Sequence, residues 1–181
     1  MKKIAKCGIV DQVIKFAEFK ETSKLKKLDG KKQVKIRGIP KLEDALNKFP
    51  DLSFQIDFKT DEVVEPALNV IQKTNSTDRV CIASFSSKRL ERVRSLSPNL
   101  CISMGPNEVF KTLLSRYKLI NSPLKGDCLQ VPMKYYGVKI VTKKFVEYLK
   151  SKNIKIMVWT INDVETFKYL IELEVDGIIT D

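Results

Sequence analysis

The residues of this sequence that could do covalent chemistry have no partner that would activate them. The 181 residues include four cysteines and no histidine. Cys7, Cys81, Cys101 and Cys128 lie far apart, and the last three open or sit within the apolar runs VCIASF, LCISM and DCLQVP. With no CxxC pair and no G-x-S-x-G turn, the sequence predicts neither a zinc site nor a nucleophile with a base beside it. We expect reduced cysteines packed in the core.

Three other residues have types and positions that suit a binding site. Asp57 ends the strand-like part of FQIDFK, Lys59 follows two residues later, and Trp159 is the only tryptophan. Two residues apart on an extended strand, Asp57 and Lys59 point to the same side. Each residue also has an ordinary structural interpretation: a carboxylate at a strand end caps the next helix, a lysine there is solvated, and a tryptophan in IKIMVWT packs in the core. Residue type alone leaves both interpretations open.

The elements that position these residues alternate between strands and helices from Ile39 to the C-terminus. Strands are predicted in six apolar runs, at 53–58, 79–84, 99–104, 127–132, 154–159 and 175–180. Amphipathic helices are predicted at 42–49, 62–73, 87–96, 107–117, 142–152 and 163–173. The strands start 20 to 28 residues apart, the length of a β-α unit that returns parallel. The pattern predicts an α/β fold with a parallel sheet, and does not separate a barrel from an open sheet.

A closed (β/α)₈ barrel needs eight strands and typically about 250 residues, so six units fall short of one. Residues 1–38 are not expected to supply the two missing strands, because VIKFAEF is followed by the charged ETSKLKKLD and then GKK. We interpret residues 1–38 as a peripheral, insertion-like segment. Residues 39–181 are interpreted as a single domain of six β-α units.

The charge of the chain favours an anionic partner. Its 33 Lys and Arg outnumber 22 Asp and Glu, which gives a net charge of +11. Nucleic acid, a membrane surface or a phosphorylated substrate would all suit this charge, but no nucleic-acid-binding motif is visible and no nucleic acid is expected. No apolar run approaches the roughly 20 residues of a transmembrane segment, and MKKIAKCGIVDQ lacks the apolar stretch of a signal peptide. These features predict a cytoplasmic protein.

Several stretches, in order, resemble the glycerophosphodiester phosphodiesterase family. They are IPKLEDALNKFP followed by FQIDFK, then RVCIASFSSKRLERVR, CLQVP (128–132), VWTIND (158–163) and VDGIITD (175–181). The N-terminal GIVDQVIKFAEFKETSKLKKLD is similar to the segment between that family's second and third strands. The resemblance implies a partial TIM (β/α)₈ barrel of the PLC-like phosphodiesterase type, without its first two strands.

The resemblance also implies a reaction, which is hydrolysis of a glycerophosphodiester to glycerol 3-phosphate and an alcohol with a divalent cation, Mg²⁺ or Ca²⁺. Asp57 matches the family's third metal-binding acid, Lys59 its phosphate-binding lysine, and Trp159 an aromatic residue that lines the substrate cleft. Three further residues fall near strand ends, where barrel sites are built: Ser84, Phe85 and Gln130.

Departures from the family pattern bear on activity. Lys41 and Gln55 replace a threonine and an asparagine, and the family's two catalytic histidines and E-x-D acids have no counterpart. One carboxylate does not make a Mg²⁺ or Ca²⁺ site, because such ions need several oxygen ligands. We therefore expect this chain to be inactive alone.

Three functional hypotheses remain. The first is a phosphodiesterase-family protein of lipid metabolism whose activity resides in a longer chain. The second is a non-catalytic phosphate-binding pseudoenzyme or a partner-binding barrel fragment, and the third is a basic nucleic-acid binder. A six-strand arc would leave open parallel edges, which predicts self-association.

Overall fold

The computed structural model describes residues 14–15, 41–119 and 123–181. Over these residues the chain has an α/β fold. All six predicted strands are present within their predicted runs. They are β2 (Phe54–Asp57), β3 (Val80–Ala83), β4 (Cys101–Ile102), β5 (Cys128–Pro132), β8 (Lys155–Trp159) and β9 (Gly177–Ile178).

The six predicted helices are also present, and most begin at a polar residue that precedes an amphipathic run. They are α1 (Leu42–Lys48), α2 (Val64–Lys73), α3 (Ser87–Leu96), α4 (Pro106–Arg116), α5 (Lys143–Ser151) and α6 (Val164–Glu172). Ser86, Thr142 and Asp163 accept hydrogen bonds from backbone N–H groups of the first turns of α3, α5 and α6. Lys41 gives α1 no such side-chain cap, as its replacement of a threonine predicts.

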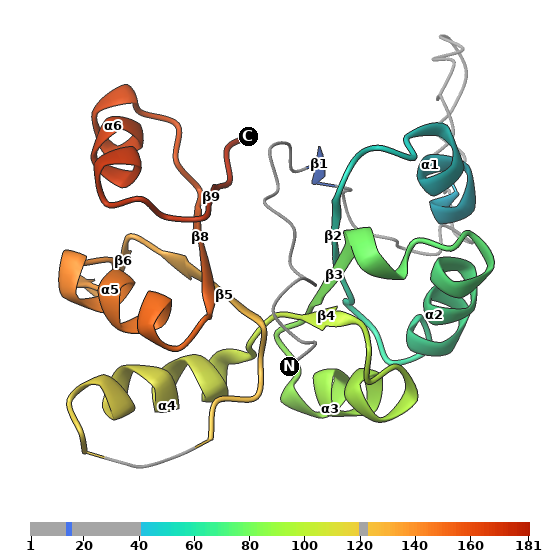
Figure 1. Ribbon diagram of the computed structural model, residues 1–181, viewed down its shortest axis with the longest axis horizontal. Helices are drawn as coiled ribbons and strands as arrows, with labels where there is room; N and C mark the ends of the chain where they lie inside the picture. Colours follow the sequence, from blue (N-terminus) through green and yellow to red (C-terminus); the bar gives the residue numbers. More distant parts are fainter. Residues whose placement is uncertain (1–13, 16–40, 120–122) are drawn as a thin grey trace, which may run out of the picture.

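The strands form one parallel arc in two segments. One sheet has the order β1-β2-β3-β4 and the other β5-β8-β9. A parallel bridge between Ser103 and Cys128 joins them, and the Met104 N–H donates to the Cys128 carbonyl at 2.8 Å. Figure 1 shows the helices around the outside of the strands, with β1 and β9 at the two ends of the arc. Within the described residues the barrel is open, as expected from the strand count.

Two elements differ from the expectation. Ile14–Lys15 form a short strand, β1, parallel to β2 at Phe54 and Gln55, so residues 1–38 do contribute a strand. The uncovered edge of β2 offers backbone groups to any extended segment, a tertiary effect that local sequence does not reveal. The rest of the expected peripheral segment lies outside the described residues.

The second difference is a hairpin of β6 (Lys134–Tyr135) and β7 (Val138–Lys139), which sequence patterns did not predict. Its two loop residues, Tyr136 and Gly137, have φ of 46° and 80°. Two left-handed loop residues match the twist of a tight hairpin. The usual Asn-Gly signal is absent because a tyrosine takes the first position.

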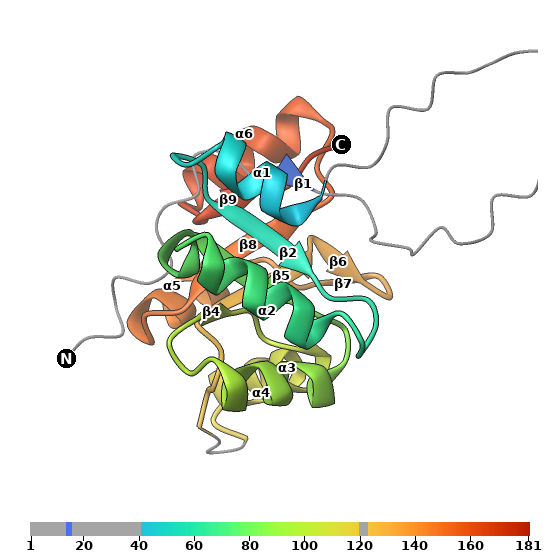
Figure 2. The same cartoon turned by 90° about the vertical axis from the view of Figure 1, so that its right-hand side faces the viewer.

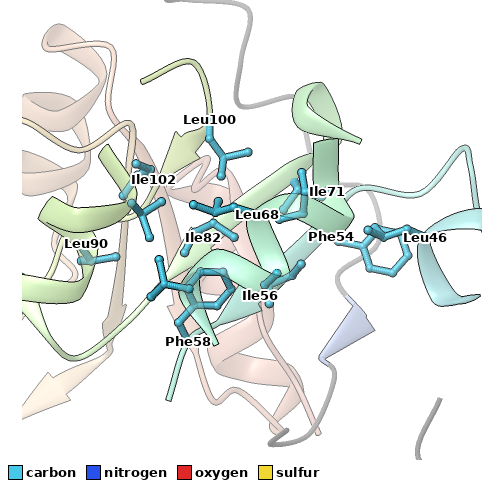
Figure 3. Close-up of a cluster of buried hydrophobic side chains, with 14 of the residues drawn as sticks. Leu46, Phe54, Ile56, Phe58, Leu68, Ile71, Ile82, Leu90, Leu100 and Ile102 are labelled. Carbon is cyan, nitrogen blue, oxygen red and sulfur yellow. The ribbon is translucent and has the colours of Figure 1, made fainter. Parts of the chain in front are cut away.

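Two hydrophobic cores lie between the strands and the outer helices. The first joins α1, α2 and α3 to β2, β3 and β4, and Figure 3 shows Phe54, Ile56 and Ile82 among leucines and isoleucines of these helices. Figure 2 looks onto this side, with α2 in front of the strands. The second core joins β5 and β8 to α5 and α6. Because side chains alternate along a strand, the residues between these core positions face the inside of the arc.

Candidate functional site

The inner residues at the carboxyl ends of the strands surround one pocket of about 390 Å³. Its lining includes five residues that the sequence singled out: Asp57, Ser84, Phe85, Gln130 and Trp159. The chain supplies them from four different strands and the residues that follow these strands. The structure thus brings these five residues together around one pocket at the carboxyl ends of the strands.

Asp57 and Lys59 form an ion pair at this pocket. The Lys59 Nζ donates to Asp57 Oδ2 at 2.7 Å, and the two side chains are 43% and 32% exposed, respectively. The same ammonium lies 5.6 Å from the centre of the Phe85 ring, which keeps it beside the pocket although Lys59 does not line it. The other Asp57 oxygen, Oδ1, is buried and has no hydrogen-bond partner within the described part of the chain. Asp57 thus has one oxygen in the ion pair and one buried oxygen whose hydrogen-bonding capacity is unused by the described residues.

A pair of glutamines crosses the inside of the arc next to Asp57. Gln55 Nε2 donates to Gln130 Oε1 at 2.5 Å, which connects β2 to β5. Gln55 Oε1 and Gln130 Nε2 are buried and, over residues 41–119 and 123–181, have no hydrogen-bond partner. Since buried polar groups are normally satisfied by protein, water or ligand, these atoms mark a polar layer that suits a bound polar group.

Ser84 lines the pocket but is committed to the structure around it. Its hydroxyl donates to the Phe58 carbonyl at 2.7 Å and accepts from Arg89 Nη1 at 2.8 Å and from the Ser86 N–H at 3.2 Å. Arg89 also binds Asp61 at 2.7 Å. Arg89 therefore connects the loop after β2 to the end of β3 through these hydrogen bonds. The sequence did not predict this positioning role, because nothing in SKRLERVR distinguishes this arginine from its neighbours.

Trp159 fits both of its sequence interpretations. The ring is partly buried and packs against the inner cluster that contains Cys81, Cys101 and Cys128, and it also lines the pocket. Phe85 is 69% exposed, so its ring forms the rim. The lining of the pocket thus includes both polar residues, such as Asp57 and Gln130, and aromatic residues, such as Phe85 and Trp159.

The described residues do not complete a Mg²⁺ or Ca²⁺ site. Asp57 is the one acidic residue that the described part of the chain contributes to the lining of this pocket, and hard divalent cations need several oxygen ligands held together. In addition, the Lys59 ammonium already neutralises this carboxylate. Asp57 would supply one of these oxygen ligands.

Three of the cysteines lie close together in space, which their spacing in the sequence did not predict. Cys81, Cys101 and Cys128 are buried thiols, which confirms their expected place in the core, while Cys7 lies outside the described residues. Their three sulfur atoms all lie within 4.8 Å of one another. Spacing rules look for ligands close in sequence, whereas parallel strands bring together residues that are 20 or more positions apart.

Comparison with known proteins shows the family to which this chain belongs. The profile of the glycerophosphoryl diester phosphodiesterase family matches residues 6–181. A curated relative from Mycobacterium tuberculosis, named probable glycerophosphodiester phosphodiesterase 2, is 32% identical over 80% of this chain and 57% of its own length. This chain belongs to the glycerophosphoryl diester phosphodiesterase family, and spans little more than half the length of that relative. Members of the family generally use a divalent metal ion.

The structure also resembles solved phosphodiesterases. A phosphodiesterase from Oleispira antarctica, solved with the product sn-glycerol-3-phosphate, matches with a TM-score of 0.59 at 16% identity, over 78% of this chain and 57% of that one. The shared fold is the TIM barrel of these enzymes, of which the described residues form an open part.

A second, short similarity has a different source. DNA topoisomerase 2 of Bombyx mori is 55% identical over 42 residues, which is 23% of this chain and 3% of that protein. This length is too small to define a family.

None of the helices among the described residues is long and apolar enough to span a bilayer.

Proposed function

We propose that this chain contributes the phosphate-binding part of a glycerophosphodiester phosphodiesterase site. Lys59 binds a phosphate oxygen, and Asp57 gives one oxygen ligand to Mg²⁺ or Ca²⁺. Trp159 packs against the carbon skeleton of the substrate. The observation that carries this proposal is the Asp57–Lys59 pair beside the pocket at the carboxyl ends of the strands, the end at which barrel active sites are built.

The chemistry of the pocket supports a glycerophosphodiester as ligand. A phosphodiester carries one negative charge, which an ammonium group can bind. The carbon atoms of glycerol and of the alcohol suit the apolar part of the lining, including Phe110, Val131 and Ile140. The related Oleispira antarctica structure holds sn-glycerol-3-phosphate, the product that hydrolysis of this class of diester would give. The chain is proposed to act in the cytoplasm.

Hydrolysis of the diester has two requirements beyond binding. The attacking oxygen must lose a proton and the leaving alkoxide must gain one, while a cation stabilises the charge on phosphate. The whole sequence contains no histidine, and among the described residues one carboxylate, that of Asp57, lines the pocket. This observation favours a second candidate, a non-catalytic binder that retains the phosphate site.

Binding can be measured through Trp159, because it is the only tryptophan and lines the pocket. Titration with sn-glycerol 3-phosphate is expected to change its fluorescence and to saturate. Lys59→Ala should weaken binding at least tenfold, a loss of about 1.4 kcal/mol. Lys152→Ala makes the same change of charge at the exposed end of α5 and should leave binding unchanged. Equal losses in both variants, or no saturable binding, would refute the proposal.

Turnover separates the two candidates. The chain is incubated with sn-glycero-3-phosphocholine and Mg²⁺ or Ca²⁺, and released glycerol 3-phosphate is assayed with a coupled dehydrogenase. Release that is lost in Lys59→Ala supports the enzyme. Saturable binding without release supports the non-catalytic binder.

A further inference from the structure

The three clustered cysteines occupy the inside of the arc, at the line where its two sheets meet. Cys81 on β3 is the register partner of Cys101 on β4. Cys128 on β5 bridges to Ser103, two residues after Cys101. The three side chains are 6%, 1% and 0% exposed, and none of them lines the pocket described above. They form a second location with its own chemistry.

The spacing of the sulfur atoms suits a thiolate-bound metal ion. The Cys81 and Cys128 Sγ atoms are 3.4 Å apart, and all three sulfurs lie within 4.8 Å of one another. A tetrahedral ion with metal–sulfur bonds of about 2.3 Å requires sulfur–sulfur distances of about 3.8 Å. The Cys81–Cys128 distance is about 0.4 Å below this value and no pair is more than about 1.0 Å above it, so small side-chain shifts would bring the three sulfurs into this geometry.

All the potential metal ligands in this cluster are sulfur atoms, which are soft donors. Met157, whose thioether sulfur is a further soft donor, packs in the same buried cluster as the three thiols. Soft sulfur ligands select ions such as Zn²⁺ over Mg²⁺ or Ca²⁺, which prefer oxygen. A divalent ion also offsets two of the three thiolate charges, which matters in an apolar interior.

We propose that Cys81, Cys101 and Cys128 form a binding site for a soft divalent metal ion of the Zn²⁺ type, with Met157 in the same buried cluster as a further soft donor. On binding, three thiols lose three protons and three sulfur–metal bonds form. The ion would link β3 and β4 of one sheet to β5 of the other. It would therefore stabilise the junction between the two cores, independently of whether the pocket binds a phosphodiester.

Cd²⁺ is a suitable probe, because its bonds to thiolates absorb in the ultraviolet. The reduced chain should show a thiolate-to-Cd²⁺ absorption band that saturates at one ion per chain. Three protons per ion should be released, measured by calorimetry in buffers of different ionisation enthalpy. The midpoint of thermal unfolding should rise with Cd²⁺ or Zn²⁺ and not with Mg²⁺.

Cys101→Ala should lose both the absorption band and the metal-induced rise in midpoint. Circular dichroism without metal shows whether Cys101→Ala folds; if it does not, the stoichiometry and proton release of the unmodified chain decide. No saturable band, or release of fewer than two protons, would overturn the proposal.

Discussion

Asp57 competes with a phosphate ligand for the ammonium group of Lys59. The ammonium that would bind a phosphate oxygen is held at 2.7 Å by a carboxylate, and this ion pair is open to solvent on one side. A phosphate must share or displace this contact. A cation on Asp57 would relieve the competition, so metal and phosphate binding should favour each other.

Asp57→Asn is expected to strengthen binding of sn-glycerol 3-phosphate when divalent cations are removed with a chelator. An exposed ion pair contributes up to about 1 kcal/mol, so the gain should not exceed about fivefold. The same variant should lose any enhancement of binding by Mg²⁺ or Ca²⁺. Titrations of Trp159 fluorescence with and without cation measure both effects. Weaker binding of the variant in chelator would contradict a competitive role for Asp57.

Asp163 gives the start of α6 a dependence on pH. The backbone N–H of Thr166 donates to Asp163 Oδ1 at 2.8 Å, and this hydrogen bond lowers the pKa of the carboxyl below its ordinary value. A carboxyl whose pKa is lower in the folded state stabilises the fold above its unfolded pKa, and the stabilisation is lost as pH falls through the folded pKa.

Asp163→Asn is therefore expected to make the loss of stability in acid less steep, because asparagine still caps a helix but does not titrate. Urea unfolding between neutral pH and the acid limit of the folded chain measures this slope. Asp163→Ala should lose the cap at every pH. An unchanged acid slope in Asp163→Asn would show that other carboxyls control it.

At the scale of elements, hydrogen bonds of Arg79, which directly precedes β3, connect the end of α1 to the sheet. Its guanidinium donates to the carbonyls of Leu46, Phe49 and Leu52 at 2.7 to 3.0 Å and to Ser76 Oγ at 2.8 Å. Two of these carbonyls belong to the end of α1, where backbone acceptors are left without helical partners. Partial burial of this guanidinium lowers the pKa of Arg79, although arginine stays charged at any physiological pH.

Arg79→Met should destabilise the chain by about 2–4 kcal/mol, because it removes charge-assisted hydrogen bonds from several backbone acceptors at once. Arg92→Met is a matched control, since Arg92 forms an exposed pair with Glu65 that is worth less than about 1 kcal/mol. The free energy of unfolding in urea compares them. Similar losses would mean that Arg79 acts through its charge and not through its carbonyl contacts.

Elements were predictable from sequence where apolar periodicity is strong. IKIMVW and VCIA read as buried strands, and KKFVEYLKS reads as a helix, because local pattern and burial agree. The hairpin at Tyr136-Gly137 and the strand at Ile14–Lys15 were missed, since one uses an unusual loop residue and the other depends on an unpaired edge. At the site, alternation placed Asp57 and Lys59 correctly, whereas Arg89 and the cysteine cluster arise from the way distant strands pair.

At the scale of the whole molecule, the arc of strands ends at β1 and β9, each of which pairs with one neighbour among the described strands. Such edges offer backbone groups to a second chain. We propose that self-association occurs through them. The exposed hairpin residues Tyr136 and Val138 are an alternative contact, since they are 90% and 64% exposed.

Sedimentation velocity over a range of concentrations should show a reversible rise in mass. Val138→Lys, which alters the hairpin and leaves the ends of the arc intact, should not change this behaviour. A monomer at every concentration, or dissociation caused by Val138→Lys, would exclude pairing through the ends of the arc.

The division of the hydrophobic interior into two cores has an evolutionary consequence. Each core is built from consecutive β-α units, and among the described residues the two sheets are joined by the Ser103–Cys128 bridge, by neighbouring backbone hydrogen bonds and by the inner cysteine cluster. A gene that loses or gains β-α units at either end of such a chain leaves at least one core with all its packing partners. Recombination between the two groups of β-α units would therefore transfer one core together with the strands and helices that pack around it.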